Sequence, residues 1–197
     1  MTNTARLCLT TPPVFEPETL APILSRLLET GRVASVRIDL ADTDEAAWTR
    51  AANHLMPVAH AADVPCLLTD RPELIQRLGL DGTHLVARTG ELGALRKTLG
   101  RDTILGAAAG TSRHLAMSLA EAGADYVSIG PVGEAATELL EWWSEMIETP
   151  SLIEGGVTAD TAPALSEVAD FLAPDPTLWT AEDPAAVLAA LASDLAG

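Results

Sequence analysis

Residues 120–132 read AEAGADYVSIGPV, and this stretch carries the chain from the end of a helix into a short apolar strand. The helical pattern before it covers residues 112–122, and the strand is predicted over residues 125–129. A second helical pattern follows over residues 138–147. Strands that alternate with helices in this way are typical of proteins built on a parallel sheet.

The same unit repeats along the whole chain. Predicted strands cover residues 6–10, 33–40, 65–68, 82–86, 103–107, 125–129, 151–154 and 170–173. Predicted helices cover residues 17–30, 44–62, 72–78, 91–99, 112–122, 138–147, 161–168 and 184–195. Eight such units, with no G-x-G-x-x-G motif after the first strand, favour a (β/α)8 TIM barrel over an open α/β sheet. The 197 residues are fewer than the roughly 250 typical of such barrels, so we expect one minimal domain over residues 1–197.

The composition excludes several classes of partner. The formal net charge is −16 and Lys97 is the only lysine, so neither nucleic acid nor an anionic membrane is expected to bind, since both attract basic proteins. No secretory signal and no membrane-spanning run is visible. Cys8 and Cys66 lie in short apolar runs and are expected to be buried thiols, which favours a cytoplasmic location. Whether the protein is a homo-oligomer is left open.

Five stretches resemble the thiamine phosphate synthase family and its TenI relatives. They read CLLTDRPEL (66–74), GLDGTHL (79–85), ILG (104–106), AEAGADYVSIGPV (120–132) and IEGGVT (153–158). Their order and spacing extend the resemblance over nearly the whole chain. The resemblance implies a TIM barrel in thiamine biosynthesis, a transferase that joins a pyrimidine diphosphate to a thiazole phosphate and releases pyrophosphate. It also implies Mg²⁺ and cationic side chains that stabilise the departing pyrophosphate.

The second predicted strand holds two candidate catalytic residues. The family resembles Gln-x-Arg-x-Lys at this point, and this chain reads Arg37-Ile-Asp-Leu-Ala41. Asp39 stands in the family's Arg place and Ala41 in its Lys place, which leaves Arg37 to supply positive charge. Because alternate residues of a strand share a face, Arg37 and Asp39 are expected on one side. They form either a buried pair that orients a ligand at the barrel mouth or a pair on the surface.

The third predicted strand ends in Thr69-Asp70, where the family resembles Asn-Asp. The resemblance implies that Asp70 is a catalytic residue and a Mg²⁺ ligand and that Thr69 contacts the substrate. A barrel places its catalytic groups at the carboxyl ends of its strands, which agrees with this role. The alternative is that Asp70 caps the helix that begins near Pro72.

Further candidate substrate contacts lie near the ends of later strands. His84 is either a proton shuttle or, as we favour, a hydrogen-bonded core histidine. Gly130 opens the loop that grips pyrophosphate in the family, and Gly155-Gly156 is expected to present backbone N–H groups to a phosphate or to form a tight turn. Glu154, next to that glycine pair, is a possible general base if it points inward.

Several places depart from the family pattern. The second metal-binding Asp, a Ser after the fifth strand and a Thr- and Lys-bearing loop are replaced by the sequences VART (86–89), AAA (107–109) and GEAATE (133–138). The sequence PDPTLW (174–179) stands where the family prefers small residues. Three hypotheses remain open: a thiamine phosphate synthase, a TenI-like isomerase acting on a small phosphorylated molecule, and a non-catalytic barrel that binds or regulates.

Overall fold

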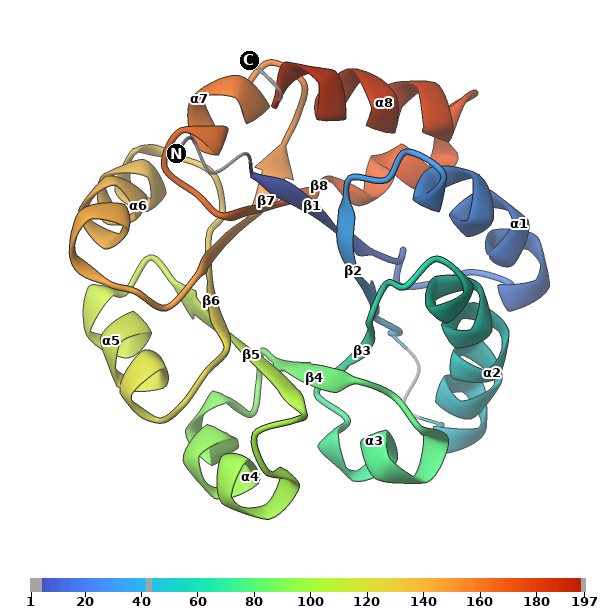
Figure 1. The fold of residues 1–197 in the computed structure, drawn as a ribbon, viewed down its shortest axis with the longest axis horizontal. Helices are drawn as coiled ribbons and strands as arrows, with labels where there is room; N and C mark the ends of the chain where they lie inside the picture. The colour runs from blue at the N-terminus through green and yellow to red at the C-terminus, as the bar shows by residue number, and fades with distance from the viewer. Residues whose placement is uncertain (1–4, 42–43, 196–197) are drawn as a thin grey trace.

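The computed structural model describes residues 5–41 and 44–195. Eight parallel strands close into a barrel in the order of the sequence, and helices form a ring around it (Figure 1). The strands are β1 (Arg6–Thr10), β2 (Val33–Ile38), β3 (Cys66–Thr69), β4 (Gly82–Leu85), β5 (Ile104–Gly110), β6 (Tyr126–Ile129), β7 (Ser151–Val157) and β8 (Phe171–Pro174). The prediction of a (β/α)8 barrel is therefore confirmed.

The helices follow the strands one by one. They are α1 (Pro17–Leu28), α2 (Glu45–Ala61), α3 (Pro72–Leu78), α4 (Leu92–Leu99), α5 (Arg113–Glu121), α6 (Glu134–Met146), α7 (Ala162–Ser166) and α8 (Pro184–Asp194). Two 3₁₀ turns, η1 (Thr89–Glu91) and η2 (Pro176–Thr180), precede α4 and α8.

The start of α6 was wrong in the sequence prediction, which placed residues 133–137 in a loop. The helix begins at Glu134, and the Thr137 backbone N–H and hydroxyl both donate to the Gly133 carbonyl, at 3.0 Å and 3.1 Å. Glu134 lies in the first turn, where the helix dipole favours a negative charge, and alanine has the highest helix propensity. The acidic stretch is thus the first turn of a helix.

The core has two parts. The larger part lies between the barrel and the helices. The smaller part lies inside the barrel and consists of Leu67, Tyr126, Leu152 and Ala173. Gly106 makes room for the Tyr126 ring, because a Cβ at Gly106 would lie 2.1 Å from the ring carbon Cζ. Cys8 packs against the inner part and Cys66 belongs to the outer one; both are free thiols.

Aspartates close the barrel at the end where the strands begin. Asp81, Asp125 and Asp170 each precede an even-numbered strand and accept the backbone N–H of a residue at the start of the preceding strand. The donors are Cys66 (2.7 Å), Leu105 (2.7 Å) and Ser151 (2.9 Å). These bonds satisfy strand N–H groups and link the strands in pairs.

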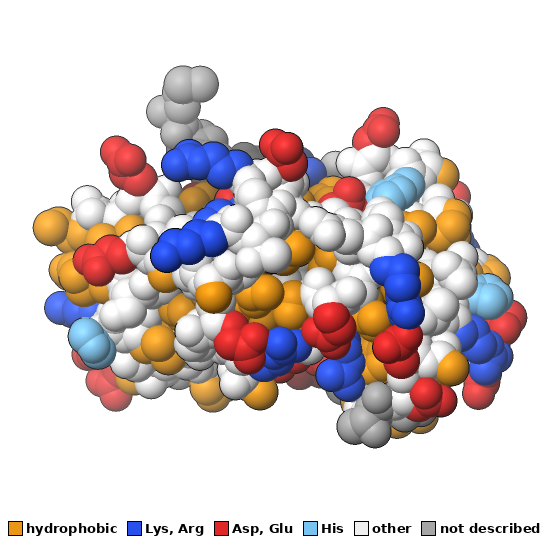
Figure 2. Space-filling model, turned by 90° about the horizontal axis from the view of Figure 1, so that it is seen from below, with side chains coloured by type: hydrophobic (Ala, Val, Ile, Leu, Met, Phe, Trp, Pro, Cys, Tyr) orange, Lys and Arg blue, Asp and Glu red, His pale blue; other side chains and the backbone are white. Residues whose placement is uncertain are grey.

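The outer surface mixes charges of both signs. On the face shown in Figure 2, acidic and basic side chains are interspersed, and no continuous basic surface is visible. Among the described residues, no helix is both long and apolar enough to cross a membrane.

Candidate active site

A layer of polar side chains lies inside the barrel above its apolar floor. The inward faces of three strands change from apolar to polar over two residues: Leu67 to Thr69, Tyr126 to Ser128, and Leu152 to Glu154. This follows from the two-residue period of a strand, which keeps residues i and i+2 on one face. Arg37 of β2 and His84 of β4 complete the layer, which lies toward the carboxyl ends of the strands, where barrel enzymes carry their active sites.

Arg37 and Glu154 form an ion pair across the interior. The Arg37 Nη2 atom lies 2.6 Å from Glu154 Oε2, and the two side chains are 10% and 21% exposed. Their strands are separated in the ring by β1 and β8, so the contact crosses the barrel. Burial alone would lower the pKa of Arg37, but the attraction of Glu154 raises it overall.

The expected pairing of Arg37 with Asp39 was wrong, because Glu154 is the ion-pair partner of Arg37. Asp39 comes one residue after β2 ends and is half-buried. Its backbone N–H donates to the Thr11 hydroxyl at 3.0 Å, which ties the end of β2 to the loop after β1. Asp39 nevertheless lies close enough to contribute to the raised pKa of Arg37.

Glu154 is ionised. Burial raises the pKa of its carboxyl, but Arg37 and the hydrogen bonds from His84 and Ser128 outweigh burial and hold the pKa well below its usual range. The Ser128 hydroxyl donates to Glu154 Oε1 at 2.5 Å, and His84 Nε2 lies 3.5 Å from the same oxygen. Groups from β2, β4 and β6 thus converge on one carboxylate of β7.

His84 is a neutral histidine in a fixed orientation. Its side chain is fully buried, and burial together with the charge of Arg37 lowers its pKa. Its ring stacks on Tyr126 at 5.5 Å between centroids, and Nδ1 lies 2.9 Å from the Tyr126 hydroxyl. Burial raises the pKa of Tyr126, so its O–H donates to Nδ1, and the remaining ring proton on Nε2 points toward Glu154. This agrees with the favoured prediction of a hydrogen-bonded core histidine.

Three buried polar atoms of the layer have no hydrogen-bond partner in the described part of the chain. They are Nε and Nη1 of Arg37 and the hydroxyl of Thr69. Arg37 and Thr69 are each 8% exposed and come from neighbouring strands. An unsatisfied buried donor costs about 1–3 kcal/mol. Such groups at the mouth of a barrel indicate a place for a ligand that accepts hydrogen bonds.

The alternative that Asp70 caps α3 was wrong. The residue at the cap position of α3 is Arg71, which makes no capping bond with its side chain. Asp70 has a left-handed backbone (φ 50°), and its two carboxylate oxygens accept the N–H groups of Val86 and Ala87 at 2.9 Å and 2.8 Å. The carboxylate therefore joins the loops after β3 and β4.

The predicted Mg²⁺ site is not preformed. Among the described residues, no group of three or more His, Cys, Asp and Glu side chains is placed to hold a metal ion. Asp70 stands alone, and each of its oxygens already accepts a backbone N–H. Because Mg²⁺ is usually held by one or two carboxylates together with waters and substrate phosphates, a Mg²⁺ ion at Asp70 stays a prediction.

The predicted glycines bring the loops after β6 and β7 close together. A Cβ at Gly130 would lie 2.1 Å from the Glu154 carbonyl oxygen, and Val132 N–H donates to the Gly155 carbonyl at 2.7 Å. Gly155 and Gly156 have φ of 78° and 102°, so both need the freedom of glycine. The tight turn is present, and both residues are exposed at the mouth.

Comparison with known proteins gives the family. The sequence model described as Thiamine monophosphate synthase matches residues 7–173. The chain is 42% identical to a thiamine-phosphate synthase of Rhodospirillum centenum, over 95% of this chain and 94% of the relative. A relative of the same name from Erythrobacter litoralis is 38% identical over 84% of both chains. The chain belongs to the thiamine monophosphate synthase family.

Solved structures extend this result at the level of the fold. A thiamine phosphate pyrophosphorylase from Pyrococcus furiosus superposes with a TM-score of 0.85 at 21% identity, over 99% of this chain and 97% of the other. A 3-hexulose-6-phosphate synthase superposes with a TM-score of 0.70 at 15% identity. The barrel of this family member is therefore shared with enzymes of other names.

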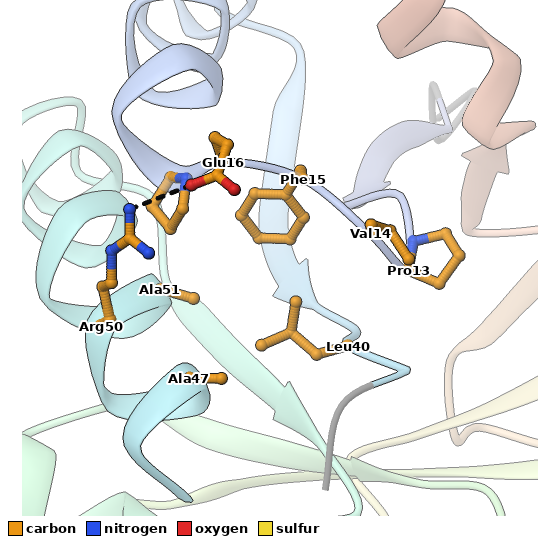
Figure 3. Close-up of a pocket in the computed structure, with 9 residues that line it drawn as sticks. Pro13, Val14, Phe15, Glu16, Leu40, Ala47, Arg50 and Ala51 are labelled. Carbon is orange, nitrogen blue, oxygen red and sulfur yellow. Dashed lines mark hydrogen bonds and ion pairs between the residues drawn. The ribbon is translucent and has the colours of Figure 1, made fainter. Parts of the chain in front are cut away.

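A cavity of about 270 Å³ lies beside the mouth and was not predicted from the sequence. It lies between the loop after β1, the end of β2 and α2, and Figure 3 shows Phe15 and Leu40 pointing into it. Its one ion pair joins Glu16 to Arg50, which also bonds Glu18. None of the predicted site residues lines this cavity, and the apolar run Pro12 to Phe15 is the sequence signal for it.

The sequence of this family member identified part of the polar layer. Arg37, Thr69 and His84 were predicted as site residues, and Glu154 was considered as an inward general base. Ser128 and Tyr126 were missed as site residues, although both lie in the quoted stretch that resembles the family. Their alternation with Val127 was the signal, since Val127 belongs to the outer core and its neighbours must face inward.

Proposed function

We propose that this chain acts in thiamine biosynthesis as a thiamine-phosphate synthase, joining a pyrimidine diphosphate to a thiazole phosphate at the barrel mouth. One observation carries the proposal. The unpartnered donors of Arg37 and Thr69 lie at the mouth of a barrel that aligns over 95% of the chain with a thiamine-phosphate synthase.

The polar layer supports binding of the reacting ring. Arg37 and Thr69 offer three hydrogen-bond donors to acceptor atoms of a ligand. Glu154, which is bonded to Arg37 and Ser128, offers a negative charge. As pyrophosphate departs, positive charge develops on the pyrimidine, and a preorganised carboxylate in a partly buried site stabilises such charge. The layer is held in place by bonds within the protein, so little reorganisation accompanies the reaction.

The exposed turn at Gly155 and Gly156 is the proposed phosphate site. A turn without side chains lets a ligand approach the backbone, and phosphate sites in such barrels commonly use the loops after strands seven and eight. After β8, Asp175 caps η2 through the Thr177 N–H at 2.9 Å, and Trp179 Nε1 donates to the Thr10 carbonyl at 2.6 Å. These bonds fix the second loop of the proposed site.

An assay with the two phosphorylated substrates tests the proposal. Wild-type protein is expected to turn over, with Mg²⁺ varied because the prediction that Asp70 binds it has not been tested. Arg37→Met is expected to lower kcat/KM by about 10²-fold or more, since it removes two donors and the partner of Glu154. Arg50→Gln, which removes two surface ion pairs, is the matched control and should keep wild-type turnover. Absence of wild-type turnover at every Mg²⁺ concentration would overturn the proposal.

A second candidate is a barrel that binds a phosphorylated thiazole, as an isomerase or a non-catalytic protein. The observation that favours it is the scarcity of cations: among the described residues Arg37 is the only Lys or Arg that is buried. Arg88, at the rim, is held by Glu73 and Glu91. No turnover combined with a rise in melting temperature on adding thiazole phosphate would favour this candidate.

The remaining expectations stay predictions. They are a cytoplasmic location, a small phosphorylated molecule as the partner, no binding to nucleic acid or membrane, and possible homo-oligomers.

A further inference from the structure

The outer face of α5 and α6 exposes apolar side chains that the barrel does not cover. The two helices are neighbours in the ring around the barrel (Figure 1), and Met117 of α5 and Met146 of α6 are 37% and 63% exposed. Trp142 of α6 is half-buried, and the Arg113 guanidinium lies over its ring, 4.1 Å from the ring centroid. Trp, Met and Arg are the residue types enriched at the centres of protein–protein interfaces.

The charges at the two ends of α5 oppose the dipole of their own helix. Arg113 is the first residue of α5, where the dipole favours an acidic side chain, and Glu121 is the last, where it favours a basic one. By contrast, α3 carries Glu73 in its first turn and Arg77 in its last. In the part of the chain that the structure describes, neither Arg113 nor Glu121 has an ion-pair partner. Both charges are therefore unfavourable for the dipole of an isolated α5.

A second copy of α5, packed in the antiparallel direction, compensates both charges. It places Arg113 beside Glu121 of the second copy and beside the carboxyl end of that helix, and the symmetry repeats the pair at the other end. Met117 lies four residues from each of them, so it falls on the two-fold axis and meets its own counterpart. Residues spaced by four lie toward one side of a helix, so all three side chains reach the same contact.

The overall charge of the chain restricts where two copies can meet. The formal net charge is −16, so most surfaces of two copies repel each other. A contact centred on α6 would bring its exposed glutamates, such as Glu138 and Glu141, close to those of the second copy. A contact centred on α5 instead pairs each Glu121 with an Arg113. The charges therefore favour α5 as the centre of a contact between copies.

We propose that the outer face of α5 is a self-association surface, which joins two copies of this chain in an antiparallel contact with two-fold symmetry. Arg113 of each copy binds Glu121 of the other, Met117 lies at the axis, and Trp142 and Met146 extend the apolar area. Because one helix face makes an interface at the small end of the range, we expect a weak dimer, with a dissociation constant of about 10 µM. The contact lies outside the barrel wall and does not depend on the proposed function.

Exchange of charges in the full chain tests the contact. Arg113→Glu places a glutamate against Glu121 of the second copy, and Glu121→Arg places an arginine against its Arg113. Each variant alone should therefore raise the dissociation constant by about 10-fold or more. An equimolar mixture of the two variants opposes glutamates on one copy to arginines on the other, so it should form a heterodimer. Sedimentation velocity over a range of protein concentrations, at an ionic strength of about 0.15 M, measures both results.

Controls separate the contact from net charge and from folding. Arg77→Glu changes the net charge as Arg113→Glu does, at an exposed ion pair on α3, and should keep the wild-type dissociation constant. Melting temperatures are compared at a concentration where the wild type is monomeric. Both α5 variants should melt at the wild-type temperature or above, because their side chains are exposed and each change favours the dipole of α5.

The inference is supported if the mixture dimerises and the single variants do not. A wild type that stays monomeric at about 200 µM, well above the expected dissociation constant, overturns it. Single variants that dimerise like the wild type, or a mixture that stays monomeric, overturn it as well. Rescue of Arg113→Glu by Glu138→Arg in place of Glu121→Arg would put α5 against α6 of the second copy and overturn the antiparallel contact. These outcomes are the same whether or not the synthase assay detects turnover.

Discussion

At the end of the barrel where the strands begin, Asp81, Asp125 and Asp170 each accept a strand N–H, whereas at the other end Arg37 and Thr69 hold buried donors without partners. Both ends bury polar groups near the strands, but only one end satisfies them within the described chain. The first end serves stability. The second end keeps hydrogen-bond donors that only a ligand can satisfy. These unsatisfied donors lower the stability of the unliganded protein.

The largest expected effect comes from breaking the ion pair at the mouth. Glu154→Leu leaves Arg37 buried without a counter-charge and is expected to lower the free energy of unfolding by about 3–5 kcal/mol. Urea denaturation measures the change. The double variant Arg37→Met with Glu154→Leu should recover most of the loss, because no lone charge remains. A single variant as stable as the double one would show that Arg37 is not buried as described.

The opposite end should respond differently. Asp125→Ala removes the acceptor of the Leu105 N–H and the ion-pair partner of Arg96, and is expected to cost about 1–3 kcal/mol. Since Asp125 lies at the end of the barrel opposite the mouth, kcat/KM should not change. Arg77→Gln, at an exposed pair with Glu45, is the control and should cost less than about 1 kcal/mol. A drop in kcat/KM in Asp125→Ala would contradict the assignment of stability to one end of the barrel and ligand binding to the other.

Thr69→Val is a change at the mouth that is expected to raise stability, whereas the two preceding changes lower it. It replaces an unpartnered buried hydroxyl by a methyl group of similar size, so the unliganded protein should gain about 1 kcal/mol of stability. Turnover should weaken if the hydroxyl serves a ligand. The matched control is Ser128→Ala, which removes a hydroxyl that does bond to Glu154 and should therefore lose stability. A destabilised Thr69→Val would mean that the hydroxyl already has a partner.

The fold was predictable because each strand–helix unit carries a local signal. Predicted strands of four to eight residues alternate with helical patterns, and eight of them leave closure as the simplest arrangement. The burial of His84 was also predicted, since it lies within a predicted strand, whereas alternation alone left open whether Arg37 points inward or to the surface. The start of α6 was missed because Gly133 interrupts the pattern, although Glu134 favours a helix start.

The contacts of the site were not predictable in the same way. Glu154 lies 117 residues from Arg37 in the sequence, and only closure of the barrel brings them together. Asp39 was the nearer candidate by sequence, but β2 ends before it. Asp70 likewise finds its donors on the next loop, at Val86 and Ala87, where the sequence shows only side chains without charge or hydroxyl.

The smallest effect expected is a pH dependence through His84. Burial and the charge of Arg37 lower the pKa of His84, so the folded protein keeps it neutral while the unfolded chain protonates it below its ordinary pKa of about 6.5. The unfolded state then binds more protons, so this contribution to stability is complete above about pH 6.5 and is lost as the pH falls.

Between pH 7.5 and 5.5 the wild type should lose about 1 kcal/mol more than His84→Gln, measured by urea denaturation at each pH. The other histidines are common to both proteins and cancel, and His114→Gln, at an exposed position, should follow the wild-type curve. Parallel curves for wild type and His84→Gln would mean that His84 titrates equally in both states, and its fixed role between Tyr126 and Glu154 would have to be abandoned.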